Sequence, residues 1–196
     1  LRSRGHEVVV VDGGSEDGTP ELAAPFVDQM VEVASGRAKQ MNAGAAVARG
    51  EVFWFLHADT LPFSDADEAI SRGLARLGRH WGRFDVRLSG GHCAFRVIEA
   101  MMNLRSRLTG IVTGDQGIFV ERACFEAVGG FPAIPLMEDI ALSRALGFCG
   151  RPVSLRQRLV TSSRRWEEGG VVRTILLMWR LRLSYALGAD PAILAK

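Results

Sequence analysis

Apolar residues in this chain gather in short runs that alternate with longer segments of helical periodicity. Short runs rich in β-branched and aromatic residues indicate buried strands, and apolar residues three and four positions apart indicate amphipathic helices. This alternation predicts an α/β protein. The expected strands are residues 7–11, 30–34, 52–56, 82–89, 118–120 and 152–161, and the expected helices start at residue 19 and cover residues 38–49, 65–77, 95–108, 122–128, 140–146 and 171–187.

The stretch from Glu51 to Thr60 connects an apolar strand to polar side chains. Residues 52–56 predict a parallel strand covered on both faces, and the run ends abruptly at His57 and Asp59. Ligands of open α/β sheets bind beyond the carboxyl ends of such strands, so these side chains are expected at the mouth of a site. The alternative is a plain turn in which Asp59 and Thr60 cap the following segment.

A second strand, residues 7–11, also ends in a carboxylate, Asp12, and a loop of Gly13, Gly14 and Ser15 follows it. The loop does not have the G-x-G-x-x-G spacing of dinucleotide sites, and it lacks the lysine of a P-loop. Asp12 could instead accept a hydrogen bond from a base or ribose, because glycines let a ligand approach the backbone closely.

Two further positions carry candidate charges, each with a structural alternative. Lys39, in the first turn of the helix over residues 38–49, could meet phosphate oxygens or simply lie on a solvated helix face. Glu138 and Asp139 open the helix over residues 140–146, where the helix dipole favours carboxylates. A general base held at that position is the functional interpretation of the acidic pair.

Composition limits the classes of protein that fit. At 196 residues and 47% apolar content the chain suits one α/β domain, and a net charge of +2 does not suggest nucleic-acid binding. Cys93, Cys124 and Cys149 are expected to be reduced core thiols of a cytoplasmic protein, without a disulfide framework or a zinc site. The opening Leu-Arg-Ser-Arg-Gly resembles the end of a helix with its glycine stop, so we expect residues before Leu1.

The last predicted helix, residues 171–187, is apolar but carries three arginines. At about 100° per residue Arg173, Arg180 and Ser184 share one face, while Arg182 points the opposite way. The helix could belong to the core, bind a partner, or lie on a membrane where arginines meet anionic headgroups. Packing on the domain or in a homodimer is favoured over peripheral contact with the inner face of the membrane.

The order of these motifs resembles glycosyltransferase family 2 proteins of GT-A fold, and more narrowly the bacterial subgroup called radical-SAM/selenodomain-associated transferase 2. The resemblance implies one nucleotide-sugar-binding and catalytic domain over residues 1–166, with a mixed, mainly parallel sheet, and an apolar helical extension over residues 167–196. It also implies an interior strand before Leu1 that supplies donor contacts. The motifs are Val10–Thr19, Lys39–Gly44, Ala48–Glu51, Phe55–Thr60, Val128–Phe131 and Met137–Ile140.

The resemblance assigns roles to most of the candidate residues. The last carboxylate of the family's Asp-x-Asp motif, here Asp59 of His57-Ala58-Asp59, would ligate a divalent metal. His57 would either join it, which suits Mn²⁺ better than Mg²⁺, or touch ribose or phosphate. Asp139 would be the catalytic base of an inverting transfer, with Glu138 beside it. The expected donor-binding residues are Asp12, Gly13, Gly14, Ser15, Lys39, Asn42, His57, Ala58 and Asp59, and the expected acceptor or diphosphate residues are Asp115, Gln116, Arg164, Arg165 and Trp166.

The function implied is a metal-dependent, inverting transfer of a sugar from a UDP- or GDP-type donor to an unknown hydroxyl acceptor. A non-catalytic nucleotide-sugar-binding or scaffolding protein is the alternative, because His57 replaces an Asp and part of the pocket is absent. A sugar nucleotidyltransferase is less favoured, because the early Gly-rich loop is not followed by a basic phosphate-binding segment.

Overall fold

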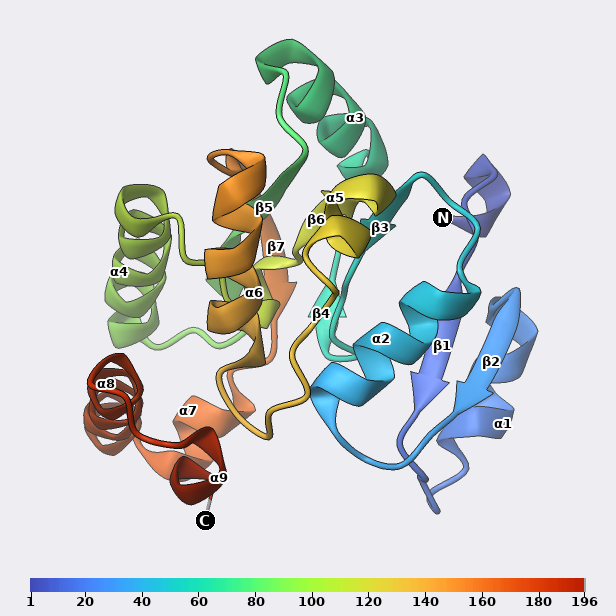
Figure 1. Cartoon of the computed structure of the whole chain (residues 1–196). Helices are drawn as coiled ribbons and strands as arrows, with labels where there is room; N and C mark the ends of the chain where they lie inside the picture. Colours follow the sequence, from blue (N-terminus) through green and yellow to red (C-terminus); the bar gives the residue numbers. More distant parts are fainter. Residues whose placement is uncertain (196) are drawn as a thin grey trace.

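The computed structural model, which describes residues 1–195, is an α/β fold whose strands form two sheets flanked by helices (Figure 1). Strands β1 (Val9–Asp12) and β2 (Gln29–Glu32) form a parallel pair. The second sheet has the order β3-β6-β5-β7-β4. Its strands are β3 (Val52–Trp54), β4 (Thr60–Leu61), β5 (Trp81–Leu88), β6 (Phe119–Glu121) and β7 (Val153–Thr161).

The predicted helices are present with small differences at their ends, and two short helices, Arg164–Gly169 and Pro191–Leu194, lie outside the predicted ranges. Short 3-10 turns lie at Arg2–Arg4, Ala24–Phe26, Gly114–Gln116 and Gly147–Cys149. The α-helices are α1 (Thr19–Ala23), α2 (Arg37–Val47), α3 (Ala66–Leu77), α4 (Cys93–Thr109), α5 (Arg122–Ala127), α6 (Glu138–Leu146), α7 (Arg164–Gly169), α8 (Val171–Ala186) and α9 (Pro191–Leu194).

The mixed sheet of the expected fold class is confirmed, but its strands pair differently from the prediction. In the five-stranded sheet only β5 and β7 run parallel, and the other three pairs are antiparallel. The prediction that residues 52–56 form a parallel strand covered on both faces is wrong. Strand β3 is shorter, pairs antiparallel with β6, and leaves Val52 exposed. Strand β1 is half-buried rather than fully buried.

Two apolar clusters cover the two faces of the larger sheet. On one face, Phe53 and Trp81 pack against residues of α2, α5 and α6, including Phe125 and Leu142. On the other face, Phe84 and other strand residues pack against α3. Since α6 is held on this sheet by its buried side chains, the acidic pair at its first turn has a fixed position at the sheet edge.

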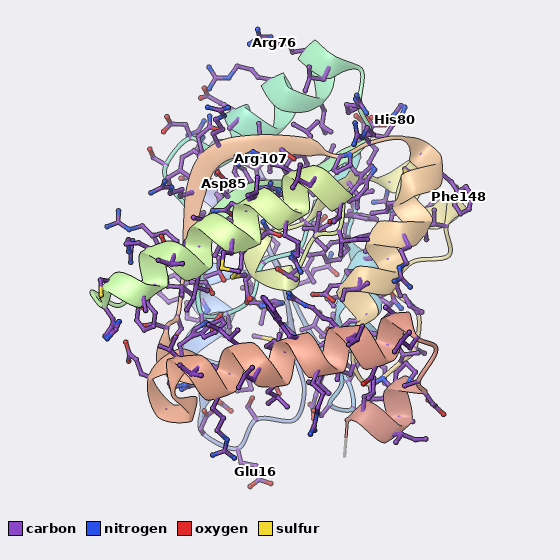
Figure 2. All side chains as sticks on the ribbon, turned by 90° about the vertical axis from the view of Figure 1, so that its left-hand side faces the viewer. Glu16, Arg76, His80, Asp85, Arg107 and Phe148 are labelled. Carbon is purple, nitrogen blue, oxygen red and sulfur yellow. A yellow bond between two sulfur atoms is a disulfide. The ribbon has the colours of Figure 1, made fainter. Side chains whose placement is uncertain are left out.

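Strand β5 buries two charged side chains. Arg83 is fully buried and Asp85 is 7% exposed. Arg83 binds the Asp85 carboxylate and donates to the Asn103 carbonyl at 3.1 Å, and Arg107 reaches the second oxygen of Asp85 at 2.6 Å. Figure 2 shows Asp85 and Arg107 together beside α4. Helix α4 covers this face of β5, which is why these charged side chains are buried. The sequence over residues 82–89 predicts the strand correctly but not the burial of its charged residues.

The expectation of three reduced core thiols is wrong. Cys124 and Cys149 form a disulfide that joins α5 to the turn after α6, and Cys93 is exposed. Sequence spacing could not reveal the bond, because the two cysteines are brought together only when α5 and α6 pack in the same cluster.

The C-terminal helix α8 packs on the domain with one face and leaves the other uncovered. Val171 and Ile175 pack against a cluster that contains Phe95 and Ile98 of α4. We call the uncovered stripes of the two helices the α4/α8 face, and Figure 2 shows both helices running across the front of the molecule. Its exposed apolar residues are Val97, Met101, Leu104 and Leu108 on α4 and Val172, Leu176, Leu177, Trp179 and Leu183 on α8.

Within residues 1–195, no helix combines the length and the apolar character needed to cross a membrane.

Candidate functional site

A cavity of about 2740 Å³ opens between β1, β3, α6 and α8. Pockets for small ligands measure about 300–1,000 Å³, so this cavity is larger than one ligand needs. Part of it is an apolar slot between β1 and β3, which are not paired with each other. The rest is polar, and the charged or titratable residues that line it there are Arg37, His57, Asp59, Arg105, Asp115, Glu138, Asp139, Arg164, Arg165, Glu168, Arg173, Arg180 and Arg182.

Asp139 lies in the first turn of α6 and is held there by backbone amides. Its Oδ1 accepts a hydrogen bond from the amide of Ile140 at 2.7 Å, and its Oδ2 accepts one from the amide of Gly114 at 3.1 Å. Met137, the residue before the first residue of α6, has a φ of 69°, a left-handed conformation that is uncommon for a residue with a side chain. The two backbone donors hold this side chain at a fixed position in the first turn of the helix.

Glu138, the other member of the acidic pair, is 3% exposed. Burial, with a smaller contribution from the negative charge of Asp139, raises the pKa of Glu138 above its usual value. The Nε of Arg37 lies 3.5 Å from its Oε1 and only partly offsets these effects. A proton on Glu138 is therefore favoured relative to the unfolded chain. Asp139, which is less buried and lines the cavity, is the better placed of the two to accept a proton from a ligand.

The turn at Gly114 brings His57 and Asp115 to the same wall as Asp139. A Cβ built on Gly114 would clash with the imidazole of His57, so a larger residue there would displace the His57 side chain. The Nδ1 of His57 is 3.4 Å from the Oδ1 of Asp115. Burial alone would raise the pKa of Asp115, but the hydrogen bond with His57 and the charges of Arg37 and Arg165 lower it. Asp115 is thus a carboxylate surrounded by cations.

Arg37, the first residue of α2, connects the two acidic groups. Its Nη2 lies 2.9 Å from the Nε2 and 3.2 Å from the Nδ1 of His57, and its Nε faces Glu138. One guanidinium therefore contacts both the loop after β3 and the first turn of α6. In this position Arg37 supplies positive charge to the polar wall of the cavity.

Two further arginines, Arg105 of α4 and Arg182 of α8, enter the same cavity. Burial, with the nearby charge of Arg182, lowers the pKa of Arg105 to about 10. Burial also lowers the pKa of Arg182, although Asp139 and Asp115 partly offset this effect. Both guanidinium groups therefore lie within electrostatic reach of Asp139.

Comparison with known proteins identifies the family. Residues 2–107, more than half of the chain, match the family model described as "Glycosyl transferase family 2". The chain belongs to glycosyl transferase family 2. No curated protein sequence gave a significant match to it. The narrower subgroup named from the sequence stays a prediction.

Solved structures with the same fold include three glycosyltransferase-like proteins. S. aureus TarS 1-349 in complex with UDP-GlcNAc has a TM-score of 0.65 at 17% identity, covering 80% of this chain and 49% of that one. The mannosyltransferase PcManGT from Pyrobaculum calidifontis, in complex with GDP-Man and Mn2+, has a TM-score of 0.61 at 23% identity. The match covers 91% of this chain and 51% of that one. The mannosyl-3-phosphoglycerate synthase from Rubrobacter xylanophilus has a TM-score of 0.52 at 17% identity, and the match covers 93% of this chain and 66% of that one. The chain spans about half the length of the first two structures, and these identities show the fold.

The predicted donor residues of this family 2 chain fall into two groups. His57, Ala58 and Asp59 line the cavity, whereas the six upstream residues do not. The Asp12 carboxylate accepts hydrogen bonds from the Ser15 hydroxyl at 2.6 Å and from loop amides, which lower its pKa. Asp12 therefore holds its own loop in shape in this structure. Gly13, Gly14, Ser15, Lys39 and Asn42 also lie outside the cavity lining, and Asn42 binds the backbone of Phe131.

The predicted acceptor or diphosphate residues also differ in position. Asp115, Arg164, Arg165 and Trp166 line the cavity. Gln116 is fully buried and closes the turn through Thr113, so its side chain is structural here. The two arginines lie on helix α7 rather than in a loop, and Trp166 packs against the cluster beneath α8.

A divalent metal, which the family resemblance implies, fits Asp59 better than His57. Asp59 is exposed to the cavity, and one carboxylate suffices for an ion that takes its other ligands from phosphates and water. Both ring nitrogens of His57 already face the Arg37 guanidinium, which disfavours a second cation there. Within residues 1–195, no group of three or more His, Cys, Asp or Glu side chains could hold a metal by itself.

Three cavity residues, Arg37, Arg105 and Arg182, were missed as site residues from the sequence. Arg37 had a usable signal, because it directly follows the glycine turn at the start of α2, on the side of the predicted strand ends. Arg182 also had one, since helical periodicity placed it opposite Arg173 and Arg180. Arg105 had none, because whether an arginine on an amphipathic helix faces inward depends on how the helix packs.

Proposed function

We propose that this protein transfers a sugar from a nucleotide-diphosphate donor to a hydroxyl acceptor with inversion at the sugar C1, with Asp139 as catalytic base. The observation that carries this proposal is the Asp139 carboxylate, held by the amides of Ile140 and Gly114 in a cavity that also exposes Asp59 and several arginines, in a chain of family 2.

The reaction follows from these groups. The acceptor oxygen attacks the sugar C1 while the bond from C1 to the diphosphate oxygen breaks, and the hydroxyl proton passes to the Asp139 carboxylate. Negative charge develops on the leaving diphosphate, so cations are needed on that side. Arg37 and Arg165 are the protein groups suited to this task, and Glu138 keeps Arg37 oriented.

A divalent metal held by Asp59 would add Lewis-acid stabilisation of the leaving diphosphate when it is bound. TarS binds UDP and UDP-GlcNAc, and PcManGT binds GDP-Man with Mn2+, which supports a UDP- or GDP-type donor and a Mn²⁺ or Mg²⁺ ion for this chain. His57 would contact the donor through its ribose or phosphate, and Asp12 with its glycine loop would border the nucleoside.

Asp59→Ala is expected to abolish metal-dependent stabilisation by the cognate nucleotide. Thermal unfolding of the wild type is measured with UDP, GDP, ADP, dTDP and CMP, each with and without Mn²⁺. A ligand at about 100 times its dissociation constant adds roughly 2.7 kcal/mol. For a chain of this size that corresponds to a rise of roughly 5–10 °C in melting temperature.

The matched control for this experiment is Glu51→Ala, which removes an exposed carboxylate outside the cavity and should keep the full shift. A nucleotide shift that survives in Asp59→Ala would remove Asp59 from the site. No shift with any of the five nucleotides would overturn the donor-binding assignment itself.

We also propose that the α4/α8 face binds an anionic lipid surface, where the acceptor would be presented. The exposed apolar residues of each helix recur at i, i+4, i+7 and i+11, as on a helix that lies in a membrane interface. Arg173 and Arg180 flank the stripe of α8, which contains no acidic residue, and the one acidic residue of α4, Glu99, is buried. A second copy of the chain would bring these arginines together and is disfavoured by charge.

Trp179→Glu is expected to abolish co-flotation with vesicles that contain about one-third phosphatidylglycerol, because it puts a charge in the centre of the apolar stripe. Vesicles of phosphatidylcholine alone should recruit the wild type weakly, since each arginine near an anionic surface contributes about 1 kcal/mol. The control is Phe148→Glu, an exposed aromatic at the edge of the view in Figure 2, away from both helices. Equal flotation with both lipids, or a dimer in light scattering that Trp179→Glu dissociates, would contradict a lipid partner.

A further inference from the structure

The cavity contains a pair of arginines, neither of which forms an ion pair with a carboxylate of residues 1–195. Arg105 and Arg182 come from different helices, α4 and α8, and both line the cavity next to Asp139. Like charges brought together in a partly buried site repel each other and lose hydration, so folding alone does not favour this arrangement. A negatively charged ligand would remove both costs.

The buried hydrogen-bond donors of Arg105 also lack partners. Its Nε and Nη2 are buried, and no atom of residues 1–195 accepts a hydrogen bond from them. No carboxylate in that part of the chain forms an ion pair with Arg105 or Arg182. Arg83, which is also buried, has a Nε without an acceptor as well, but its guanidinium has the Asp85 carboxylate as a partner, which Arg105 lacks. Buried guanidinium donors are normally paired, so the donors of Arg105 indicate a missing acceptor.

The position of the pair indicates which substrate would supply that acceptor. In Figure 1, helices α4 and α8 lie on the side of the molecule opposite β1, whose end carries the Asp12 loop. Asp139 lies between these two sides and acts electrostatically on both arginines. A donor with its nucleoside near β1 and its diphosphate near Asp59 and Arg37 would bring its sugar to Asp139. The arginine pair then lies beyond the sugar, on the acceptor side.

We propose that Arg105 and Arg182 bind an anionic group of the acceptor, a phosphate or a carboxylate, and so hold its hydroxyl beside Asp139; this inference rests on the proposed function. Two guanidinium groups offer planar, forked donors that match the oxygens of either group. The acceptor class is therefore a hydroxyl compound with a negative charge close to the reacting hydroxyl. A neutral sugar or alcohol would leave the pair uncompensated.

Isothermal titration with small probes tests the site without any turnover. The probes are inorganic phosphate and glycerol 3-phosphate, with glycerol as the neutral counterpart of the latter. The wild type should bind both phosphates and not glycerol. Arg105→Gln and Arg182→Gln should each weaken phosphate binding at least tenfold, because each removes charge-assisted hydrogen bonds. Arg105→Lys keeps the positive charge but lacks the forked donors of a guanidinium, so it should lose less affinity for phosphate than Arg105→Gln.

The control is Arg76→Gln on α3, an exposed arginine far from the cavity that changes the net charge equally (Figure 2). It should bind phosphate like the wild type. No phosphate binding by the wild type, or the same loss in Arg76→Gln as in Arg105→Gln, would overturn the proposal.

A second titration separates the acceptor from the donor as the source of the anion. Phosphate is titrated into protein saturated with the nucleotide and Mn²⁺ identified by thermal unfolding. Undiminished phosphate binding supports an acceptor subsite, whereas displacement of phosphate by the nucleotide shows that the pair binds the donor diphosphate and overturns the assignment. If no nucleotide binds, the proposed function fails, while loss of phosphate binding in Arg105→Gln still identifies the anion site.

Discussion

Asp139→Asn is expected to lower the rate of sugar release from the donor by about 10²- to 10⁴-fold, because the amide cannot accept the proton of the attacking hydroxyl. Nucleotide binding should be retained, since Asp139 is placed on the acceptor side of the sugar. The amide oxygen can still accept one of the two backbone hydrogen bonds, so the fold should lose about 1 kcal/mol of stability. The measurement is nucleoside diphosphate released from the identified donor, with water or glycerol 3-phosphate as acceptor.

Glu51→Gln, an exposed carboxylate outside the cavity, is the matched control and should keep the wild-type rate. The experiment also separates the enzyme from a non-catalytic nucleotide-sugar-binding protein. Both would bind nucleotide in the Asp139→Asn variant, but only an enzyme has turnover to lose. A variant that releases diphosphate as fast as the wild type would exclude Asp139 as the base.

Asp85→Ala is expected to reduce the free energy of unfolding by about 3–5 kcal/mol, because it leaves the buried Arg83 guanidinium without its carboxylate. Arg107 loses its partner at the same time. For a chain of this length the melting temperature should fall by roughly 6–20 °C. Thermal unfolding followed by circular dichroism checks the result.

An exposed ion pair provides the comparison for this variant. Glu126→Ala removes the partner of Arg122 on α5, where Glu126 is exposed, and should change stability by less than about 1 kcal/mol. The double variant Arg83→Met with Asp85→Leu removes both charges and should recover most of the loss. A double variant as unstable as Asp85→Ala would show that the charge left unpaired is not the cause.

The sequence predicts the elements of this fold well because each has its own local signal. Apolar runs mark the strands, and periodicity with flanking glycines marks the helices, so α3, α4, α6 and α8 lie within a few residues of their predicted ranges. Strand direction has no such signal. Strand β3 has the composition of a parallel strand, but its direction relative to β6 depends on the path of the chain between them.

The candidate site could be predicted where its residues follow a strand or start a helix. His57 and Asp59 follow β3, and Glu138 and Asp139 start α6, so their display in the cavity follows from position alone. Asp12 has the same kind of position but turns its carboxylate to its own loop, which Ser15 makes possible. Arg105 lies within a helix, and only the packing of α4 shows that it faces the cavity, whereas helical periodicity already separated Arg182 from the other two arginines of α8.

The Arg105–Arg182 pair also implies a trade-off between thermal stability and the proposed binding in the same cavity. Replacing Arg105 by an apolar residue of similar length would remove a buried charge and raise the melting temperature, since the lowered pKa of Arg105 reflects a cost that the folded protein carries. Selection for thermal stability alone would therefore discard this residue. Because Arg105 is proposed to bind the anionic group of the acceptor, an enzyme engineer seeking a more robust form of the protein should leave it in place.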